Sequence, residues 1–365
     1  MKAIVSGGGS GGHIFPAVAI ANAIKKRWPE ADILFVGAEG RMEMEKVPAA
    51  GYDIKGLPIA GLQRKLTPAN IIKNLQLPFR ILKSNHKVKS ILRDFNPDIV
   101  VGVGGFASEP TLKAATRLGY KTLLQEQNSY AGLTNKMLAR DAQTICVAYE
   151  GMERFFPKEK IVFTGNPVRA AIEQMNCTRE EGLAHFGLRP DMPVVLVVGG
   201  SLGARSMNQM MLDGLEYIES QQVQYIWQTG RWGYNMATAA VKEGSRVKVH
   251  EFIQRMDLAY AAADVVISRA GAIAISELCI VGKPVVLIPS PNVAEDHQTK
   301  NAMALVNKGA AMMVPDVECG TKCLPLVAEL LADKGRQASM CEAIGKMAVR
   351  GAADKIVDEI EKIVK

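Results

Sequence analysis

The fold is decided by residues 3–13, Ala-Ile-Val-Ser-Gly-Gly-Gly-Ser-Gly-Gly-His, in which a short apolar strand runs straight into glycines and a histidine. A second stretch of this kind occupies 194–205, where Val-Val-Leu-Val-Val precedes Gly-Gly-Ser-Leu-Gly-Ala-Arg. Glycines between a buried strand and a helix let backbone N–H groups approach a phosphate at the positive end of the helix. The repetition predicts two nucleotide-fold domains that face each other across a cleft holding a phosphorylated ligand.

The composition is that of an ordinary globular protein with an excess of basic residues. The chain has 365 residues, 48% of them hydrophobic and 22% charged, and a net charge of +7. This length exceeds what one core usually holds, so two domains are expected. The positive charge suits a polyanionic partner. With only 6% aromatic residues and no interleaving of basic and stacking side chains, nucleic acid is disfavoured as that partner.

Cysteine usage and hydropathy bear on compartment and cofactor. The six cysteines are scattered without a Cys-x-x-Cys pair, which argues against a structural metal site and is typical of a reducing cytoplasm. We expect no metal and no cofactor. The chain opens on a strand and has no apolar run of about 18–20 residues, so neither a secretory signal nor a spanning helix is expected.

Apolar strand-like runs alternate with helix-like stretches along the chain. Several runs are continuous in valine, isoleucine and leucine, as expected for parallel strands covered on both faces. The alternation predicts an α/β fold with two doubly wound, Rossmann-like parallel sheets. Strands are predicted at 2–6, 32–37, 98–103, 121–125, 144–147, 161–164, 194–199, 223–228, 247–249, 264–268, 285–288 and 311–314.

The segment 164–169, Thr-Gly-Asn-Pro-Val-Arg, follows the last strand of the first half and is the natural hinge. We therefore predict an N-terminal domain over 1–164 and a second domain over 165–344. The tail from about Cys341 to Lys365 carries apolar residues at helical spacing and predicts one helix. Its part from 345 to 365 is expected to pack back on the first domain.

Glycine and polar residues follow many of the predicted strands at their carboxyl ends, where doubly wound sheets bind ligands. Examples are Gly104-Gly105 after 98–103 and Glu126-Gln127-Asn128 after 121–125. So many such loops predict one large ligand cleft.

Single motifs leave alternatives open. Gly7-x-Gly9-x-x-Gly12, with Glu39 beyond a second strand, fits a nicotinamide-dependent oxidoreductase, another phosphate site or a plain tight turn. His13 is either a capping residue or functional, and its place beside a glycine loop favours function. Glu277 lies in a helix of small and apolar residues that follows a glycine, which favours a ribose ligand over a solvated face.

Taken together, the motifs resemble one family. The blocks GGGSGGHIFPA, VGVGGFAS, QEQNSYAGLTNK, FTGNPVR, VVGGSLGAR, FIQRM, SRAGAIAISE and EDHQTKNA occur in order from residue 3 to about 350. They are similar to the undecaprenyldiphospho-muramoylpentapeptide β-N-acetylglucosaminyltransferases, members of glycosyltransferase family 28 that add N-acetylglucosamine to lipid I and form lipid II in peptidoglycan synthesis. A dehydrogenase has no reason to repeat the glycine loop at 199–205.

The resemblance implies a GT-B fold, with UDP-N-acetylglucosamine in the C-terminal domain and the lipid acceptor in the N-terminal one. Uracil would lie on the backbone of Ile253, and the ribose hydroxyls would pair with Glu277. The diphosphate would meet Ser201 and the start of the helix that runs through Gly271, Ala272, Ile273, Ala274, Ile275 and Ser276. The sugar would meet Gln298, with Asn128, Arg169 and the Ser10-Gly11-Gly12 loop closing from the other side. His297 stands where the family often has glutamine.

Inverting transfer requires a base that takes a proton from the acceptor hydroxyl. His13 is the first candidate, because a helix N-terminus disfavours its protonation, and Glu126 is the second. No Asp-x-Asp pair is present to hold a divalent metal. The acceptor diphosphate is expected at Gly8, Gly9, Gly104 and Gly105.

The stretch 66–91 mixes apolar and basic residues and contains no acidic one. Such a segment suits an anionic membrane surface, although its apolar residues could instead face the core. The residues assigned to the membrane are Ile71, Ile72, Lys73, Leu75, Phe79, Arg80 and Lys83. We expect a peripheral protein on the cytoplasmic face of the inner membrane, with the cell-wall and division machinery as candidate partners. A non-catalytic binding protein for nucleotide sugars or polyprenyl phosphates is the alternative of another class.

Overall fold

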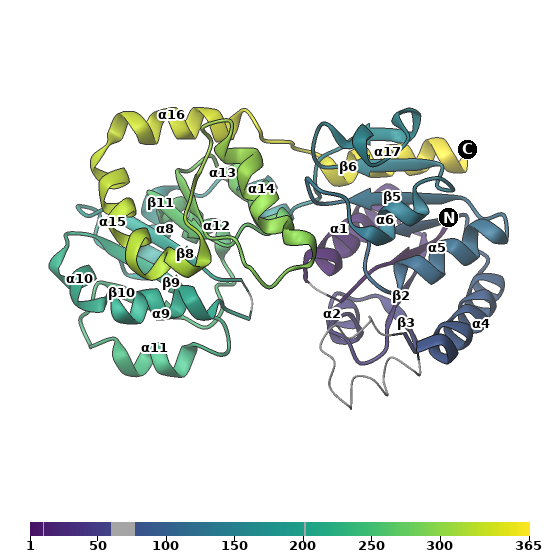
Figure 1. Ribbon diagram of the computed structural model, residues 1–365, viewed down its shortest axis with the longest axis horizontal. Coiled ribbons are helices and arrows are strands. Elements are labelled where there is room, and N and C mark those ends of the chain that lie inside the picture. The colour runs from purple at the N-terminus through teal and green to yellow at the C-terminus, as the bar shows by residue number, and fades with distance from the viewer. Residues whose placement is uncertain (10, 60–76, 201) are drawn as a thin grey trace. The chain divides into compact units, whose positions relative to one another are not determined.

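The computed structural model describes residues 1–9, 11–59, 77–200 and 202–365, and it divides into two compact units (Figure 1). Unit 1 comprises Met1–Val168 and Gly351–Lys365, and unit 2 comprises Arg169–Arg350. The boundary between the units at 168/169 falls inside the predicted hinge at 164–169. The chain passes back from unit 2 to unit 1 at 350/351, six residues after the boundary predicted at 344.

Unit 1 is built on a parallel sheet with the order β3-β2-β1-β4-β5-β6-β7. Parallel pairing in register joins β1 to β2 through Ala3 and Ile33, and β1 to β4 through Ala3 and Ile99. The central strands are buried on both faces because helices cover both sides. The strands are β1 (Lys2–Ser6), β2 (Asp32–Ala38), β3 (Asp53–Leu57), β4 (Ile99–Gly102), β5 (Thr122–Glu126), β6 (Thr144–Val147) and β7 (Ile161–Phe163).

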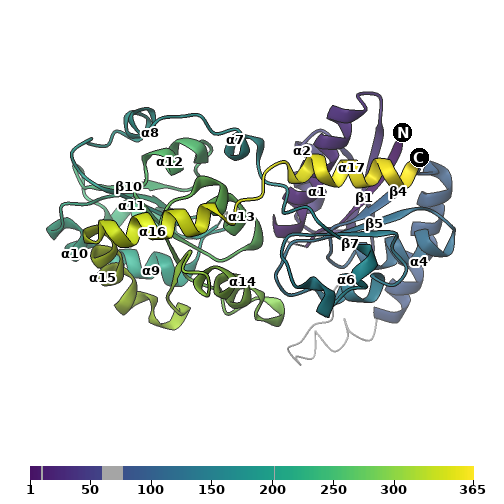
Figure 2. The same cartoon turned by 90° about the horizontal axis from the view of Figure 1, so that it is seen from above.

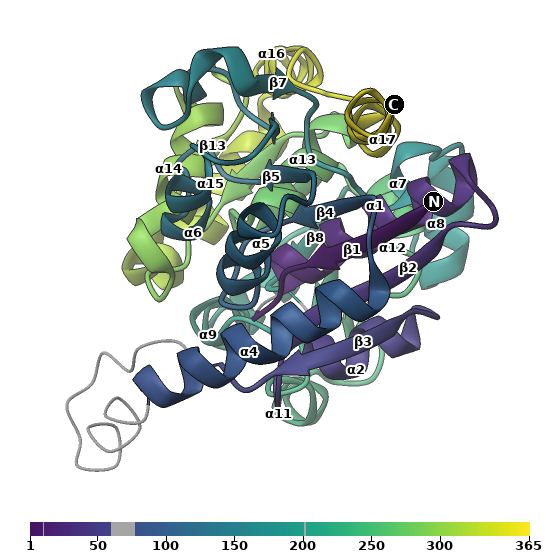
Figure 3. The same ribbon diagram turned by 90° about the vertical axis from the view of Figure 1, so that its right-hand side faces the viewer.

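Alternate residues of β1 point into two different cores of unit 1. Ala3 and Val5 pack with α1 (Gly11–Arg27), α2 (Glu43–Ala49) and α17 (Ala352–Val364). Ile4 packs on the other face with α4 (Leu77–Phe95), α5 (Ser108–Arg117) and α6 (Leu133–Leu138). Figures 2 and 3 show this three-layer arrangement, with α17 alongside α1. Two 3-10 turns, Met152–Arg154 and Lys158–Lys160, complete the unit.

Unit 2 repeats the plan with the order β10-β9-β8-β11-β12-β13. One face packs on α9, α11, α15 and α16 through an apolar core that contains Trp227. The strands are β8 (Val194–Val198), β9 (Gln224–Gln228), β10 (Val247–His250), β11 (Val265–Ser268), β12 (Val285–Leu287) and β13 (Met312–Met313). The helices are α7 (Ala170–Glu173), α8 (Arg179–Phe186), α9 (Arg205–Asp213), α10 (Leu215–Ser220), α11 (Tyr234–Ala240), α12 (Met256–Ala262), α13 (Ala272–Val281), α14 (His297–Val306), α15 (Cys319–Ala332) and α16 (Lys334–Gly345), with 3-10 turns at Ala294–Asp296 and Asp316–Glu318.

The C-terminal tail differs from the single helix predicted for 341–365. Helix α16 ends at Gly345 in unit 2, and α17 begins at Ala352 in unit 1. Gly351 takes a φ of 68°, which breaks the helix just before α17. The helical spacing of apolar residues continued across the break, so periodicity alone could not reveal it. Arg27 of α1 holds α17 through Asp358 at 2.7 Å and Glu361 at 2.7 Å.

The predicted strands form with shifts of at most one residue at each end, but the sequence analysis missed β3. This strand reads Asp-Ile-Lys-Gly-Leu and lies at the edge of the sheet, where only β2 pairs with it. Its first three residues are exposed or half-buried, so it lacks the continuous apolar run of the central strands. Edge strands carry a weak hydrophobic signal for this reason.

Candidate active site

The strand order reverses once in each sheet, between β1 and β4 in unit 1 and between β8 and β11 in unit 2. Ligands of doubly wound sheets bind outside the carboxyl ends of the strands at such a reversal. The glycine loops 7–12 and 103–107 leave β1 and β4, and the loops 199–204 and 269–271 leave β8 and β11. Each unit therefore carries one half-site of predicted residues.

In unit 1, His13 lies in the first turn of α1 and is half-buried. Its Nδ1 lies 3.1 Å from the carbonyl oxygen of Gly8. The neutral tautomer with hydrogen on Nδ1 donates to this oxygen and carries its lone pair on Nε2. A Cβ added to Gly104, whose φ is +90°, would lie 3.0 Å from Nε2. Glycine at 104 therefore leaves room for the imidazole ring.

The two loops of unit 1 touch through their backbones. A Cβ on Gly105 would lie 2.3 Å from the carbonyl oxygen of Gly8, so no side chain fits there. Gly105 also has a φ of +89°, which disfavours other residues. The predicted phosphate glycines thus lie together at the switch point.

Glu43 supports the first glycine loop, and the sequence analysis missed it. Its side chain is 1% exposed, and its two oxygens accept hydrogen bonds from Gly9 N at 2.9 Å and Ala38 N at 3.1 Å. A Cβ on Gly8 would lie 2.2 Å from Glu43 Oε1. The N–H of Gly9, expected to contact the acceptor diphosphate, therefore already has a carboxylate partner. A buried acid far from the motif in sequence gives no pattern that would reveal it.

Glu126, the second candidate base, is a buried acceptor of four hydrogen bonds. Oε1 accepts from Asn128 N at 3.0 Å and Asn128 Nδ2 at 3.2 Å, and Oε2 accepts from Asn135 Nδ2 at 2.9 Å and Gly132 N at 3.0 Å. Burial raises the pKa of Glu126, and the four donated bonds partly offset that rise. This geometry suits a residue that positions Asn128 and the start of α6.

In unit 2, Glu277 of α13 is 3% exposed and pairs with Arg169. The Nε of Arg169 donates to Oε1 at 2.6 Å and Nη2 donates to Oε2 at 2.5 Å, a bidentate arrangement. Arg169 is the first residue of unit 2, which agrees with its place in the second predicted domain. A ribose that pairs with Glu277 must share or replace these contacts.

Gln228, at the end of β9, connects two of the predicted donor segments and was not foreseen. Its Oε1 accepts from Ile253 N at 2.9 Å, and its Nε2 donates to the carbonyl oxygen of Gly200 at 3.1 Å. The side chain is 3% exposed. It therefore fixes the loop expected at the diphosphate relative to the segment expected at uracil.

Three further hydrogen bonds stabilise the loops around α13. Arg269 donates to Asp316 at 2.5 Å and to Ser206 at 2.9 Å, and so joins the loop after β11 to the start of α9. Gln298 Oε1 accepts from Ser290 N at 2.8 Å. Helix α13 starts after Gly271 with no side-chain cap, so its first N–H groups point toward the switch point.

Family models match both units of the chain. The model described as glycosyltransferase family 28 N-terminal domain matches residues 3–147, and the C-terminal domain model matches 194–356. The chain belongs to glycosyltransferase family 28. Its membership makes it a glycosyltransferase with the GT-B fold, in agreement with the prediction.

Full-length relatives of this family-28 chain carry one name. A UDP-N-acetylglucosamine–N-acetylmuramyl-(pentapeptide) pyrophosphoryl-undecaprenol N-acetylglucosamine transferase from Parabacteroides distasonis is 55% identical over 365 residues, covering 100% of this chain and 98% of that protein. The transferase of the same name from Porphyromonas gingivalis is 52% identical, covering 100% and 96%. The crystal structure of MurG from Acinetobacter baumannii superposes with a TM-score of 0.78 at 28% identity, covering 99% of each chain.

The structure of the calicheamicin glycosyltransferase CalG4 shares the fold of this family-28 protein with a TM-score of 0.72 at 15% identity, covering 100% of this chain and 98% of the other.

The predicted residues Ser10 and Ser201 lie outside the described residues, as do Ile71, Ile72, Lys73 and Leu75. Phe79, Arg80 and Lys83 belong to α4, and Lys83 is exposed.

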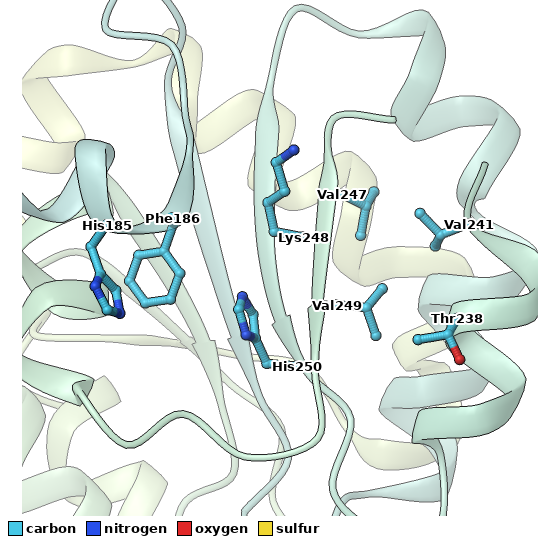
Figure 4. A pocket seen from close by; sticks show the side chains of 8 residues that line it. All are labelled: His185, Phe186, Thr238, Val241, Val247, Lys248, Val249 and His250. Atoms are coloured by element: carbon cyan, nitrogen blue, oxygen red, sulfur yellow. The ribbon is translucent and has the colours of Figure 1, made fainter. Parts of the chain in front are cut away.

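A pocket of about 270 Å³ lies beside the edge strand β10, outside both half-sites (Figure 4). His185, Phe186 and His250 line it on one side. The Phe186 ring lies 4.8 Å from that of His185 and 5.3 Å from that of His250. Burial lowers the pKa of His250, and the neighbouring His185 lowers it further. Among the residues that the structure describes, none of those predicted for the donor site lines this pocket.

Within the described ranges, no cluster of three or more His, Cys, Asp or Glu residues is arranged to hold a metal ion. A search of the same ranges finds no helix with the length and apolar character needed to cross a bilayer.

Proposed function

We propose that this glycosyltransferase transfers N-acetylglucosamine from UDP-N-acetylglucosamine to the 4-hydroxyl of the muramoyl-pentapeptide of lipid I, with inversion, and so forms lipid II. The observation that carries this conclusion is the 55% identity over the full chain with a relative named for this transfer. The alternatives, an oxidoreductase and a non-catalytic binding protein, have no comparable support.

The acceptor reacts at the half-site of unit 1. The acceptor hydroxyl attacks the anomeric carbon from the face opposite the departing UDP, and His13 Nε2 takes its proton. The contact of Nδ1 with Gly8 orients the ring for this step. General-base catalysis of this kind contributes roughly 10²–10⁴-fold. Because Glu126 accepts four hydrogen bonds, it positions Asn128 rather than acting as the base.

The donor binds at the half-site of unit 2. The backbone of Ile253 holds uracil, Glu277 holds the ribose hydroxyls, and Gln298 and Asn128 hold the sugar. Ser201 and the N–H groups at the start of α13, from Gly271 to Ala274, receive the diphosphate. Charge that develops on the leaving UDP is stabilised there. Arg169, once its pairing with Glu277 is shared with ribose, adds positive charge beside the donor.

The acceptor diphosphate lies on Gly104 and Gly105, with Gly8 and Gly9 beside them. The N–H of Gly9 is hydrogen-bonded to Glu43, so the loop with Gly104 and Gly105 supplies most of the contact to the diphosphate.

The acceptor's polyprenyl chain stays in the membrane, and the stretch 66–91 brings unit 1 to the cytoplasmic surface of the membrane. Exposed Leu82 and Lys83 at the described end of this stretch support a surface role. Partners in the cell-wall and division machinery would meet the enzyme there.

A turnover assay tests the proposed function. The full chain is incubated with UDP-N-acetylglucosamine and a soluble lipid I analogue, and UDP and the disaccharide product are measured with and without EDTA. We expect turnover in both conditions, because we propose a metal-independent reaction. Donor binding without product would instead favour the non-catalytic alternative, and loss of activity with EDTA would contradict metal independence.

A further inference from the structure

Unit 2 exposes a cluster of large apolar side chains next to its first two strands. Trp232 is 80% exposed, Met236 is 56% exposed and Leu202 is 52% exposed. We call these three residues the Trp232 patch. Leu202 follows β8, whereas Trp232 and Met236 belong to the loop after β9 and to α11. Such a group of apolar side chains on a soluble unit marks a surface that contacts something else.

The backbone beneath the Trp232 patch is fixed by close packing. A Cβ on Gly230 would lie 2.0 Å from Gly203 N, so the loops that carry Leu202 and Trp232 touch directly. Asn208 of α9 donates to the carbonyl oxygen of Thr229 at 2.8 Å and accepts from Trp227 Nε1 at 3.1 Å. Helices α9 and α11 pack together here (Figure 1). The fold therefore presents Trp232 on a rigid base.

Two exposed arginines and one exposed glutamate lie near the Trp232 patch; the glutamate is Glu251, whose carbonyl oxygen accepts a hydrogen bond from Gly230 N at 3.1 Å. The segments 199–212 and 229–241 contain Arg205 and Arg231 and no aspartate or glutamate. Both arginines are exposed. The nearby acids of the turn at 316–318 are paired, Asp316 with Arg269 at 2.5 Å and Glu318 with Lys322 at 2.8 Å. The surface thus combines a tryptophan, two aliphatic side chains and two exposed arginines.

We propose that the Trp232 patch binds the surface of an anionic lipid bilayer. Tryptophan favours the membrane interface, where its ring is buried and its N–H meets the polar region. Met236 and Leu202 would enter the same layer, and Arg205 and Arg231 would lie against anionic headgroups. The donor-binding unit then has a membrane contact of its own, separate from the stretch 66–91. Its use in catalysis rests on the proposed function, but the binding itself does not.

Tryptophan fluorescence tests the contact directly, because the three tryptophans differ in exposure. Trp227 is fully buried and Trp28 is half-buried, which leaves Trp232 as the exposed reporter among them. The full chain with Trp28→Phe is mixed with vesicles of phosphatidylglycerol and phosphatidylcholine, a fraction of the lipid carrying a nitroxide near the headgroup. We expect a blue shift and quenching that weaken as salt rises. Trp232→Phe in the same background should abolish both signals.

A pair of variants separates this contact from the rest of the enzyme. Trp232→Ser with Met236→Ser should weaken vesicle binding about tenfold, whereas Val317→Ser, at an 89% exposed apolar position in the same unit, should not. The double variant should keep full turnover on a soluble lipid I analogue and lose turnover on vesicle-embedded acceptor. Equal melting temperatures confirm that both variants are folded. Failure of all turnover would count against the proposed function alone.

Three results would overturn the proposal. The first is an unchanged Trp232 emission while the protein sediments with the vesicles, and the second is no binding to anionic vesicles. The third is protection of Trp232 from a soluble quencher by a partner protein without lipid, combined with no response to vesicles.

Discussion

The two switch points share a backbone plan but are supported by different chemistry. In unit 1 the buried carboxylate of Glu43 supports the glycine loop at Gly9, and that of Glu126 supports the loop after β5 at Asn128. In unit 2 the corresponding loop is supported by the neutral amide of Gln228 on Gly200. A carboxylate beside a loop disfavours a second anion there, whereas a neutral amide does not. The two loops thus occupy equivalent positions in the fold but differ in the charge of the side chain that supports them.

In the proposed function, unit 1 carries the base for proton transfer and unit 2 holds the diphosphate of the donor. His13 lies within the carboxylate-supported half-site, where its Nδ1 meets Gly8. The N-terminus of α13 and the cation of Arg169 lie in the other half-site. Substitutions in one unit should therefore alter turnover, and substitutions in the other should alter donor affinity.

The largest effect is expected from His13→Ala. Without the imidazole the acceptor proton has no base, so turnover should fall about 100-fold or more. UDP binding, measured by calorimetry, should stay within twofold because the donor is held by unit 2. His86→Ala is the matched control, since His86 is an exposed histidine of the same unit. Wild-type turnover in His13→Ala would show that His13 is not the general base and would contradict the assignment of proton transfer to unit 1.

Glu277→Ala, unlike His13→Ala, should weaken donor binding more than it lowers turnover. Loss of hydrogen bonds from ribose to a charged acceptor should weaken donor binding by about 2–3 kcal/mol, with the larger change in KM than in kcat. The variant also leaves Arg169 without its bidentate partner. Glu342→Ala, at an exposed glutamate paired with Lys346 in the same unit, is the control. An unchanged donor affinity in the folded variant would mean that the carboxylate serves only to hold Arg169.

Whether a site residue could be predicted from the sequence depends on whether it lies within a contiguous motif. His13, Gly104 and Glu277 stand in contiguous motifs that follow predicted strands, and in the structure these motifs lie beside the switch points. Glu43 and Gln228 lie apart from any motif, and only the fold brings them to the glycine loops. The local sequence pattern therefore identifies the residues proposed to meet ligand, whereas the residues that support them depend on tertiary contacts.

The same distinction explains the errors in the fold. Apolar residues at 344, 348, 352 and 356 keep a helical period, yet the chain passes from unit 2 to unit 1 between them. The period depends on neighbours along the chain, whereas the break depends on Gly351 and on the docking of α17 against Arg27. The pairing of Arg169 with Glu277 was not foreseen for a similar reason, because the two residues are 108 positions apart in the chain.

Glu43→Gln tests the carboxylate support of unit 1. One oxygen becomes an NH₂ group, so either Gly9 N or Ala38 N loses its acceptor, which costs about 1–3 kcal/mol of local stability. A shifted loop misplaces His13, and turnover should fall about tenfold. Donor affinity should not change. If turnover holds while the melting temperature falls, Glu43 supports the fold and not the reaction.

Gln228→Ala is the counterpart in unit 2. It removes the acceptor of Ile253 N and the donor to Gly200, both contacts of a buried side chain. Donor KM should rise severalfold to about tenfold, the range for one or two neutral hydrogen bonds, with kcat little changed. Gln228→Glu keeps the acceptor for Ile253 but places a charge near the diphosphate loop. It should weaken donor binding more than alanine does, and the reverse order would contradict the charge argument.

The smallest effect concerns the pH dependence of stability in unit 2. Burial holds the pKa of His250 below its usual 6.5, with His185 as the second cause. The unfolded chain therefore binds the proton more readily, so this contribution to stability is present above about pH 6.5 and is lost as the pH falls through the folded pKa. His250→Phe keeps an aromatic ring beside Phe186 and removes the titration. Its melting temperature should fall less than that of the wild type between about pH 6.5 and 5, and His86→Phe in unit 1 should not differ from the wild type. Parallel pH profiles for His250→Phe and the wild type would show that the pocket beside β10 does not sense pH.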